Sequence, residues 1–440
     1  MKRLLVLLIV LLLVLVLLIL TDNGLPVSPV LVWLFFVLLF FASNALMINA
    51  GGEEPTEEYE PEKKELLEER VRALANELEP FLQVNGWKTL DGVFEFEGLL
   101  RTDPAEALKG INNLVDSSKV HAILTEGEKG RAQVTLIPKE SQDQRAQRPN
   151  WPVHVILLLL TIATTTWAGA MHQGIDLLQE PTKFAVGLPY SIGLLLILGA
   201  HELGHFFAAR KHRIQVTPPY FIPAPFGLGT FGAFINIKGP VQDRRALFDV
   251  AVAGPLAGLV FAIPALLFGL QHSRVIIGNA PGDLSHNGVD VGSSFLMAIL
   301  SKLTLGPAVA EGHRIILNPL AFAGWLGLLV TALNLLPIGQ LDGGHIAHAL
   351  FGSRRAGSIS IIALVSLFSL AFFVWPGLMM FAFIVFFLAG NRDTPAANDL
   401  TGLDRSRQAV GYLAFAILAL ILVPVPHSLY GTFGIHCPYV

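Results

Sequence analysis

Residues 194–210 read LLLILGAHELGHFFAAR, and this stretch decides how the rest of the chain is interpreted. It belongs to a longer apolar run, Ser191–Ala209, which has the length of a membrane-spanning helix. Three ionisable side chains stand in its centre, His201, Glu202 and His205. Because a charged group inside the bilayer costs at least about 2.5 kcal/mol, these side chains need partners. The sequence therefore predicts a metal site inside a membrane helix.

The composition of the whole chain fits a membrane protein. Of its 440 residues, 53% are hydrophobic and 15% are charged, whereas an average soluble protein has about 25% charged residues. This excludes a disordered chain, a nucleic-acid-binding protein and an ordinary cytosolic enzyme. The single cysteine, Cys437, excludes an internal disulfide and a CxxC motif.

The charged residues divide the chain into three predicted domains. Residues 51–150 hold 34 of the 64 charged side chains, 21 of them acidic and 13 basic. We expect a transmembrane hairpin over residues 1–50, a small α+β domain over residues 51–150, and a metal-binding membrane domain with extra C-terminal spans over residues 151–440. The α+β domain contains no catalytic set of residues, which favours a regulatory or docking module. Its predicted helices are Glu62–Leu82 and Asp103–Val115, and its predicted strands are Val93–Glu97, Val120–Leu124 and Ala132–Ile137.

Apolar segments along the chain predict a polytopic α-helical membrane protein with about nine spans. The first apolar segment, Leu4–Leu20, also has the basic start and apolar middle of a signal peptide. No small-residue cleavage pattern follows it, which favours an uncleaved helical hairpin. The segment Phe295–Leu305 is too short to span and is predicted to be re-entrant or interfacial. The predicted spans are Leu4–Leu20, Val30–Met47, Val153–Ala170, Ser191–Ala209, Leu247–Leu270, Pro319–Gly339, Ile359–Trp375, Leu378–Ala389 and Tyr412–Val425.

The distribution of basic residues between the loops predicts the orientation in the membrane. With the N-terminus inside, the inner loops other than residues 51–150 hold thirteen Lys and Arg residues, and the outer loops hold four. We therefore expect the N-terminus and the 51–150 domain to face the cytoplasm. No Arg- and Ser-rich transit peptide begins the chain, which favours a bacterial protein. The sequence does not separate a bacterial plasma membrane from a thylakoid membrane.

Helical spacing brings the two histidines to one metal ion. Positions i and i+4 lie one turn apart on the same face of a helix, so His201 and His205 can both reach a Zn²⁺ ion at about 2.0–2.1 Å. Glu202 points to a neighbouring face, where it can take a proton from the attacking water without being a ligand. This is the HExxH arrangement of zinc hydrolases.

A catalytic zinc usually takes three protein ligands and keeps a fourth position open for water. Besides Glu202, only Asp342 and Asp249 are acidic residues embedded in apolar helices outside the 51–150 domain. An ion pair with the arginines that precede it explains Asp249, which leaves Asp342 as the predicted third ligand. Two histidines near Asp342 could also act as ligands or support the site, His345 and His348.

Two motifs together resemble the site-2 proteases, a family of intramembrane zinc metalloproteases. The first is the HExxH of residues 201–205, and the second is NLLPIGQLDG at residues 334–343. The resemblance covers about Trp151–Arg392. It implies one zinc ion per chain and a general base, with His201, His205 and Asp342 as the ligands and Glu202 as the base. It also implies that Asn334 helps to hold the substrate backbone or the oxyanion; alternatively, Asn334 and Pro337 only shape a broken helix.

A Pro-rich and a Gly-rich stretch follow the HExxH helix, over Pro218–Pro225 and Gly229–Ile237. The first cannot form a helix, and the second predicts a turn and a strand. Irregular backbone at membrane depth is tolerated only where it is buried in protein or lines a water-filled cavity. The resemblance implies a strand here whose edge pairs with an unwound substrate segment, so that the fold has a re-entrant loop and β-strand near the active site; the alternative is a loop that covers the cytoplasmic face. The predicted substrate-binding residues, besides Asn334, are Gly229, Gly232, Phe234 and Asn236.

Within the family, the resemblance is greatest to the cyanobacterial and chloroplast EGY-like branch. It rests on GTFGA at residues 229–233, DRR at residues 243–245, AGPLAG at residues 253–258 and a soluble domain ahead of the protease core. That branch often has Gly-Asn-Leu-Arg in the soluble domain, and GLLR at residues 98–101 departs from it at the Asn. The sequence contains no PDZ-like domain, which separates it from the stress-response branch.

We therefore expect an enzyme, a zinc metalloendopeptidase that hydrolyses peptide bonds in or near transmembrane segments, as in regulated intramembrane proteolysis. Its expected partners are transmembrane substrate proteins and the lipid bilayer, with no nucleic acid; the sequence predicts no oligomeric state. The alternative is a metal-ion transporter or channel built on the intramembrane His, Glu and Asp cluster. Transporters often contain internal repeats, and neither motif has a second copy. The intact HExxH disfavours an inactive scaffold, and another HExxH membrane family would commonly take a Glu as third ligand.

Overall fold

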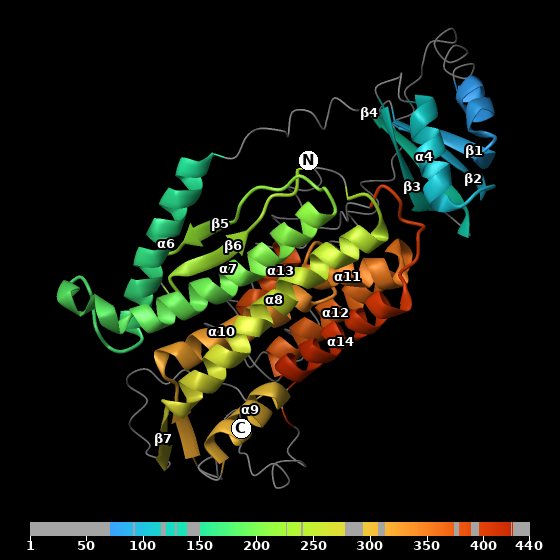
Figure 1. The fold of residues 1–440 in the computed structure, drawn as a ribbon. Helices are drawn as coiled ribbons and strands as arrows, with labels where there is room; N and C mark the ends of the chain where they lie inside the picture. The colour runs from blue at the N-terminus through green and yellow to red at the C-terminus, as the bar shows by residue number, and fades with distance from the viewer. Residues whose placement is uncertain are drawn as a thin grey trace, which may run out of the picture. The chain divides into compact units, whose positions relative to one another are not determined.

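The computed structural model describes residues 71–90, 93–115, 120–127, 130–138, 150–225, 227–238, 241–277, 294–306, 313–373, 378–388, 396–423 and 425. The predicted hairpin over residues 1–50, the first part of the predicted helix Glu62–Leu82 and Cys437 lie outside these residues. Figure 1 labels the helices and strands.

Five of the described helices are long and apolar enough to cross a membrane, so the chain is a multi-pass membrane protein. Each falls on a predicted span. The predicted spans Pro319–Gly339 and Leu378–Ala389 correspond to shorter helices, α10 (Pro319–Leu335) and α13 (Met379–Leu388). The described residues thus support five of the nine expected spans. These five are α6 (Trp151–Met171), α7 (Leu188–Lys211), α8 (Arg244–Gln271), α12 (Ser353–Phe373) and α14 (Arg405–Leu422).

Helix α10 ends before the predicted end of its span because a proline follows. Pro337 disfavours helical backbone at the residue before it, and Leu336 is extended, with φ −56° and ψ 129°. A short turn leads from there into helix α11 (Asp342–Phe351), and the backbone N–H of Gly339 in this turn donates to Oγ of Ser360. The second motif therefore spans the end of α10, the turn and the start of α11.

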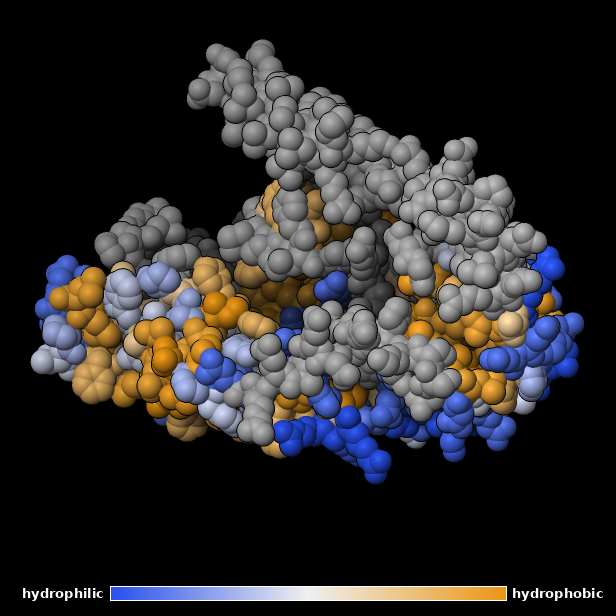
Figure 2. Space-filling view, turned by 90° about the horizontal axis from the view of Figure 1, so that it is seen from above, coloured by the Kyte–Doolittle hydropathy of each residue, from blue (hydrophilic) through white to orange (hydrophobic). Residues whose placement is uncertain are grey.

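Helices α7, α8 and α10 pack against one another and form the centre of the membrane part (Figure 1). Apolar side chains fill the space between them, among them the buried Ile197, Ala262, Leu266 and Ala332. Large apolar side chains also lie exposed, such as Leu159 on α6, and Figure 2 shows broad apolar areas on the surface. Helices that are apolar on both their buried and their exposed sides are typical of a protein in lipid.

A two-stranded antiparallel hairpin lies between α6 and α7 (Figure 1). Its strands are β5 (Tyr220–Pro223) and β6 (Thr230–Phe234). The predicted strand over Gly229–Ile237 is confirmed as β6. Strand β5 was not predicted, because its prolines indicate a loop; proline is nevertheless compatible with an edge strand, where its missing N–H faces no partner. Helix α6 holds the hairpin, since Oγ1 of Thr164 donates to the carbonyl of Gly229 over 2.7 Å.

The α+β domain contains an antiparallel sheet of four strands in the order β1-β2-β4-β3, with helix α4 (Pro104–Val115) packed against β3. The strands are β1 (Leu82–Leu90), β2 (Val93–Leu100), β3 (Val120–Glu126) and β4 (Ala132–Pro138). Residues such as Phe96, Ile111 and Leu124 are fully buried in its core. The structure confirms α4, β2, β3 and β4. It corrects the helix predicted to run to Leu82: helical residues end at Leu78 and β1 begins at Leu82, because tertiary pairing with β2 overrides the local helical pattern.

The remaining elements complete the chain. Strands β7 (Arg274–Ile277) and β8 (His313–Ile316) form a second hairpin. The predicted short segment Phe295–Leu305 is helix α9, and its N-terminus is capped by the Ser294 hydroxyl, which accepts from the N–H of Met297. Its position in the membrane stays a prediction. Late in α12, the Phe368 ring contacts the Phe383 ring of α13 at 5.4 Å between centroids.

Candidate functional site

In the middle of α7 the ionisable side chains face the protein, whereas two nearby apolar side chains, Leu203 and Phe207, face outward. His201, Glu202 and His205 are 4%, 7% and 7% exposed, whereas Leu203 and Phe207 are 40% and 64% exposed. This separation follows from the helical period, which puts positions 201, 202 and 205 on one side. The cluster is therefore enclosed within the protein and away from lipid.

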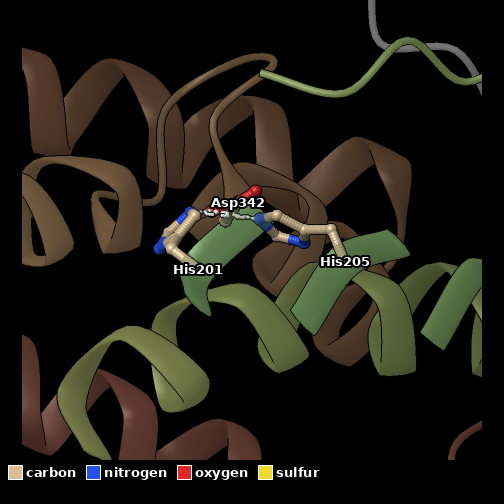
Figure 3. A group of neighbouring side chains, drawn as sticks. All are labelled: His201, His205 and Asp342. Atoms are coloured by element: carbon tan, nitrogen blue, oxygen red, sulfur yellow. Dashed lines mark hydrogen bonds and ion pairs between the residues drawn. The ribbon is translucent and has the colours of Figure 1, made fainter. Parts of the chain in front are cut away.

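Figure 3 shows the two histidines converging on Asp342. Oδ2 of Asp342 lies 3.3 Å from Nε2 of His201 and 3.2 Å from Nε2 of His205, and the two Nε2 atoms are 3.1 Å apart. Ligand atoms at about 2.1 Å from a tetrahedral ion lie about 3.4 Å from one another. Two imidazole nitrogens and one carboxylate oxygen at this spacing fit a zinc ion, and the three side chains form the one such group among the described residues.

Helix α8 fixes the orientation of the His205 ring. Nδ1 of His205 lies 2.7 Å from the backbone carbonyl of Val250. A carbonyl only accepts hydrogen bonds, so Nδ1 carries the proton and Nε2 keeps its lone pair for a metal. The ring can come this close because Gly254, on the next turn of α8, has no side chain: a Cβ at Gly254 would lie 2.1 Å from Nε2 of His205.

A methyl group at Gly254 is therefore expected to disturb the site. In Gly254→Ala the ring of His205 must move and give up either the Val250 carbonyl or its place beside Asp342. We expect zinc affinity to fall by about 10–100-fold, as when an orienting group around a metal ligand is lost. Zinc titration against a competing chelator measures this.

Gly258→Ala is the matched control, one turn further along α8. Its Cβ would lie 3.4 Å from Cβ of His201, an ordinary contact. Zinc affinity is expected to stay at the wild-type value. Equal zinc affinities in Gly254→Ala and Gly258→Ala would contradict the assignment of Gly254 as the residue that makes room for the His205 ring.

Helix α11 carries Asp342 at its N-terminus, directly against the end of α10. Two glycines follow Asp342, and a Cβ at Gly343 would lie 1.9 Å from the carbonyl oxygen of Leu335. The Gly-Gly pair therefore lets α11 start in contact with the backbone of α10. A carboxylate in the first turn of a helix is also favoured by the helix dipole. The close start of α11 places Asp342 opposite the two histidines of α7.

Glu202 contacts the segment that follows β6. Its carboxylate lies close to the backbone of Ile235. The sequence does not indicate this contact with Ile235, because a backbone group leaves no signal in residue type. The hairpin thus lies directly beside the predicted general base.

Asn334 lies at the edge of the metal cluster, with Nδ2 3.2 Å from Nε2 of His201. The four hairpin residues predicted to bind substrate are not gathered at one point. Gly229 is buried against α6 with φ 79°, and the backbone of Asn236 is paired with Thr217. The structure therefore joins Asn334, and not these four, to the metal ligands.

Phe234 and Gly232 lie on β6 itself. The ring of Phe234 is 46% exposed and stacks on Tyr220 at 5.3 Å between centroids. Gly232 has φ 102°, and a Cβ there would meet nothing within 4 Å.

Asp249 is correctly excluded as a ligand, but its predicted partner was wrong. It accepts two hydrogen bonds of 2.7 Å from Arg407 of α14 and lies 2.9 Å from Nε2 of His212. Arg244 turns instead to α11, where it donates to the carbonyl of Ala349. Arg245 lies one turn before Asp249, yet it donates to the carbonyl of Gly402, so proximity in sequence did not predict the pair. Neither His345 nor His348 belongs to the metal cluster among the described residues.

Comparison with known proteins finds one family model and several similar proteins. Residues 189–375 match the model of peptidase family M50. The chain is 32% identical over 365 residues to the Arabidopsis thaliana protein named "Probable zinc metalloprotease EGY2, chloroplastic", covering 79% of this chain and 63% of that protein. It is 31% identical over 307 residues to the corresponding EGY1 protein of Arabidopsis thaliana, covering 64% of this chain and 55% of that protein. The chain thus spans less than two thirds of the length of these relatives. No solved structure matches it significantly.

Proposed function

Because the chain belongs to peptidase family M50, which its residues 189–375 match, we propose that it is a zinc-dependent intramembrane protease. It hydrolyses peptide bonds in or near the transmembrane segments of substrate proteins. The observation that carries this proposal is the convergence of His201, His205 and Asp342 beside Glu202 within membrane helices. The names of the relatives as zinc metalloproteases support it.

His201, His205 and Asp342 hold the zinc ion in this proposal. Zinc at such a site polarises the scissile carbonyl and lowers the pKa of water towards about 7. Glu202 takes the proton of the attacking water and returns it to the leaving amine. Asn334 donates from its side-chain amide to the substrate backbone or to the oxyanion, which its place next to His201 supports.

Strand β6 supplies the substrate-binding edge. A transmembrane helix buries its peptide groups in its own hydrogen bonds, so a substrate must unwind before cleavage, and an exposed strand edge offers its backbone new partners. The position of Ile235, the residue after β6, close to Glu202 supports pairing next to the general base. Phe234 contacts substrate side chains, while Gly229 and Asn236 act indirectly, by anchoring the hairpin.

The proposed topology places the N-terminus and the α+β domain in the cytoplasm of a bacterial cell, or on the equivalent side of a thylakoid membrane. The unequal distribution of basic residues between the loops supports this orientation. The relatives named as chloroplastic support a thylakoid-related origin. Transmembrane proteins are the substrates, and the bilayer is the common solvent of enzyme and substrate.

Purified full-length protein and a model transmembrane substrate test the proposal. We expect cleavage within the substrate's transmembrane segment, complete loss of cleavage after chelation of zinc, and recovery when one equivalent of zinc is added back. Cleavage that persists without zinc would contradict the proposed chemistry. Absence of cleavage together with zinc flux into liposomes would favour the transporter alternative.

A further inference from the structure

The outer edge of the α+β sheet is covered by a segment near the end of the chain. Strand β3 is one of the two edge strands, and residues 396–402 lie beyond the region that matches family M50. The N–H of Leu124 donates to the carbonyl of Ala397, and the N–H of Asp399 donates to the carbonyl of Leu124, each over 2.8 Å. The segment thus adds backbone hydrogen bonds to a sheet edge that would otherwise be open.

The same segment is also bonded to the start of α8. The N–H of Ala397 donates to the carbonyl of Val241 over 2.8 Å, and that of Asn398 donates to the carbonyl of Gln242 over 2.9 Å. Asn398 forms isolated parallel bridges both with Leu124 and with Asp243, the N-cap of α8. Residues 397–399 therefore form backbone hydrogen bonds with the α+β domain on one side and with the membrane domain on the other.

The side chain of Asp399 enters the membrane domain and holds helix α11. Its Oδ1 lies 2.7 Å from Nε2 of His348, and the two side chains are 1% and 0% exposed. Arg244 lies beside them, with Nε 3.9 Å from Oδ1 of Asp399. Its guanidinium donates to the carbonyls of His348 and Ala349 in the last turn of α11. Arg244 thus binds free carbonyls at the end of α11, and His348 pairs with the buried carboxylate of Asp399. Loss of one partner from such a buried set is strongly destabilising.

A second contact joins β3 to the same end of α11. Gly352 terminates the helix with φ 83°, and a Cβ at this position would lie 3.3 Å from Oε2 of Glu126, the last residue of β3. The α+β domain therefore contacts the C-terminal end of α11 directly through the Glu126 side chain, and indirectly through its backbone bonds to residues 397–399.

Helix α11 links these contacts to the candidate zinc site. It has ten residues, with Asp342 at one end and the contacts to Asp399 and Arg244 at the other. A helix of this length is marginal by itself, so its position depends on what holds its ends. A displacement of its C-terminal end moves Asp342 relative to His201 and His205.

We propose that residues 396–402 are the docking site of the α+β domain, and that Asp399 is a positioning residue through which docking sets the place of Asp342. The proposal rests on the proposed function, in which Asp342 is a zinc ligand. It gives the α+β domain a role. When the domain is docked, it favours the zinc-binding position of α11; when it is undocked, α11 is no longer held in that position. By reciprocity, bound zinc strengthens the docking.

Zinc affinity and amide exchange of the full-length chain in detergent test the coupling. Asp399→Ala is expected to weaken zinc binding by about ten-fold, the lower end of what loss of a supporting group costs a metal site. It is also expected to speed amide exchange at Leu124. Stripping zinc from the wild type is expected to speed exchange at Leu124 too, and in Asp399→Ala this response to zinc is expected to disappear.

Asp404→Ala is the matched control. Asp404 is an acidic residue of the same region whose side chain is 48% exposed and pairs with Arg407 on α14, so its removal is expected to leave zinc affinity and exchange at Leu124 unchanged. If Asp399→Ala does not fold, Asp399→Asn, which keeps the size and an acceptor for His348, is expected to show smaller changes of the same kind.

A wild type that binds zinc but whose Leu124 exchange does not respond to zinc overturns this proposal alone. If both Asp399 variants bind zinc as tightly as the wild type, the docking proposal is overturned as well. A wild type that binds no zinc overturns the proposed function instead.

Discussion

Glu202→Gln is expected to retain one zinc ion per chain and to lower kcat by about 10²–10⁴-fold, the contribution of a well-placed general base. The amide has the size of the carboxylate and fits the same space beside the backbone of Ile235, so the fold and the hairpin stay in place. It cannot take a proton from water. Zinc content and single-turnover cleavage of a transmembrane substrate are the measurements.

Glu180→Gln provides the control for the loss of one negative charge. Glu180 lies in the loop before α7, where its half-exposed side chain pairs with Lys183, and this variant is expected to cleave like the wild type. Undiminished cleavage by Glu202→Gln would exclude Glu202 as the base. Loss of zinc from Glu202→Gln would indicate that Glu202 supports the metal and is not a base alone.

Asp342→Ala is expected to lower zinc affinity by more than about 100-fold, beyond the 10–100-fold cost of losing a supporting group, and to abolish cleavage. The variant leaves only the two histidines of α7, and a catalytic zinc usually requires three protein ligands. The zinc content of the purified protein after dialysis measures the effect directly.

Asp249→Asn is the control for Asp342→Ala, because Asp249 is also an acidic residue of a membrane helix. Its carboxylate pairs with Arg407 and His212, away from the metal cluster. We expect full zinc content from this variant, although its stability falls because charged partners are left partly unpaired. Zinc loss in Asp249→Asn that matches the loss in Asp342→Ala would contradict the ligand assignment.

Local periodicity predicted the parts of the fold that depend on one segment. The apolar runs predicted α6, α7, α8, α12 and α14 because the bilayer requires each segment to satisfy its own backbone hydrogen bonds. The predicted span ran past Pro337 to Gly339, although α10 ends at Leu335, and prolines hid strand β5, whose existence depends on pairing with β6.

In the candidate site, too, one part depends on a single helix and another on the packing of several helices. The spacing of His201 and His205 on one helix settles by itself that both can reach one ion, since helical geometry is local. The choice of Asp342 over Asp249 followed from the ion pair expected for Asp249 and from the motif around Asp342, and the packing of α7, α8 and α11 brings the acid within 3.3 Å of both rings.

The sequence by itself determined a multi-pass membrane protein with an HExxH helix and a later acidic ligand. Only the tertiary structure decided what surrounds them: the Val250 carbonyl on His205, the backbone of Ile235 beside Glu202, and the Asp399 carboxylate on His348. The physical reason is that hydrogen-bond partners far apart in sequence depend on how helices pack, and backbone groups, which every residue carries, give no signal in residue type.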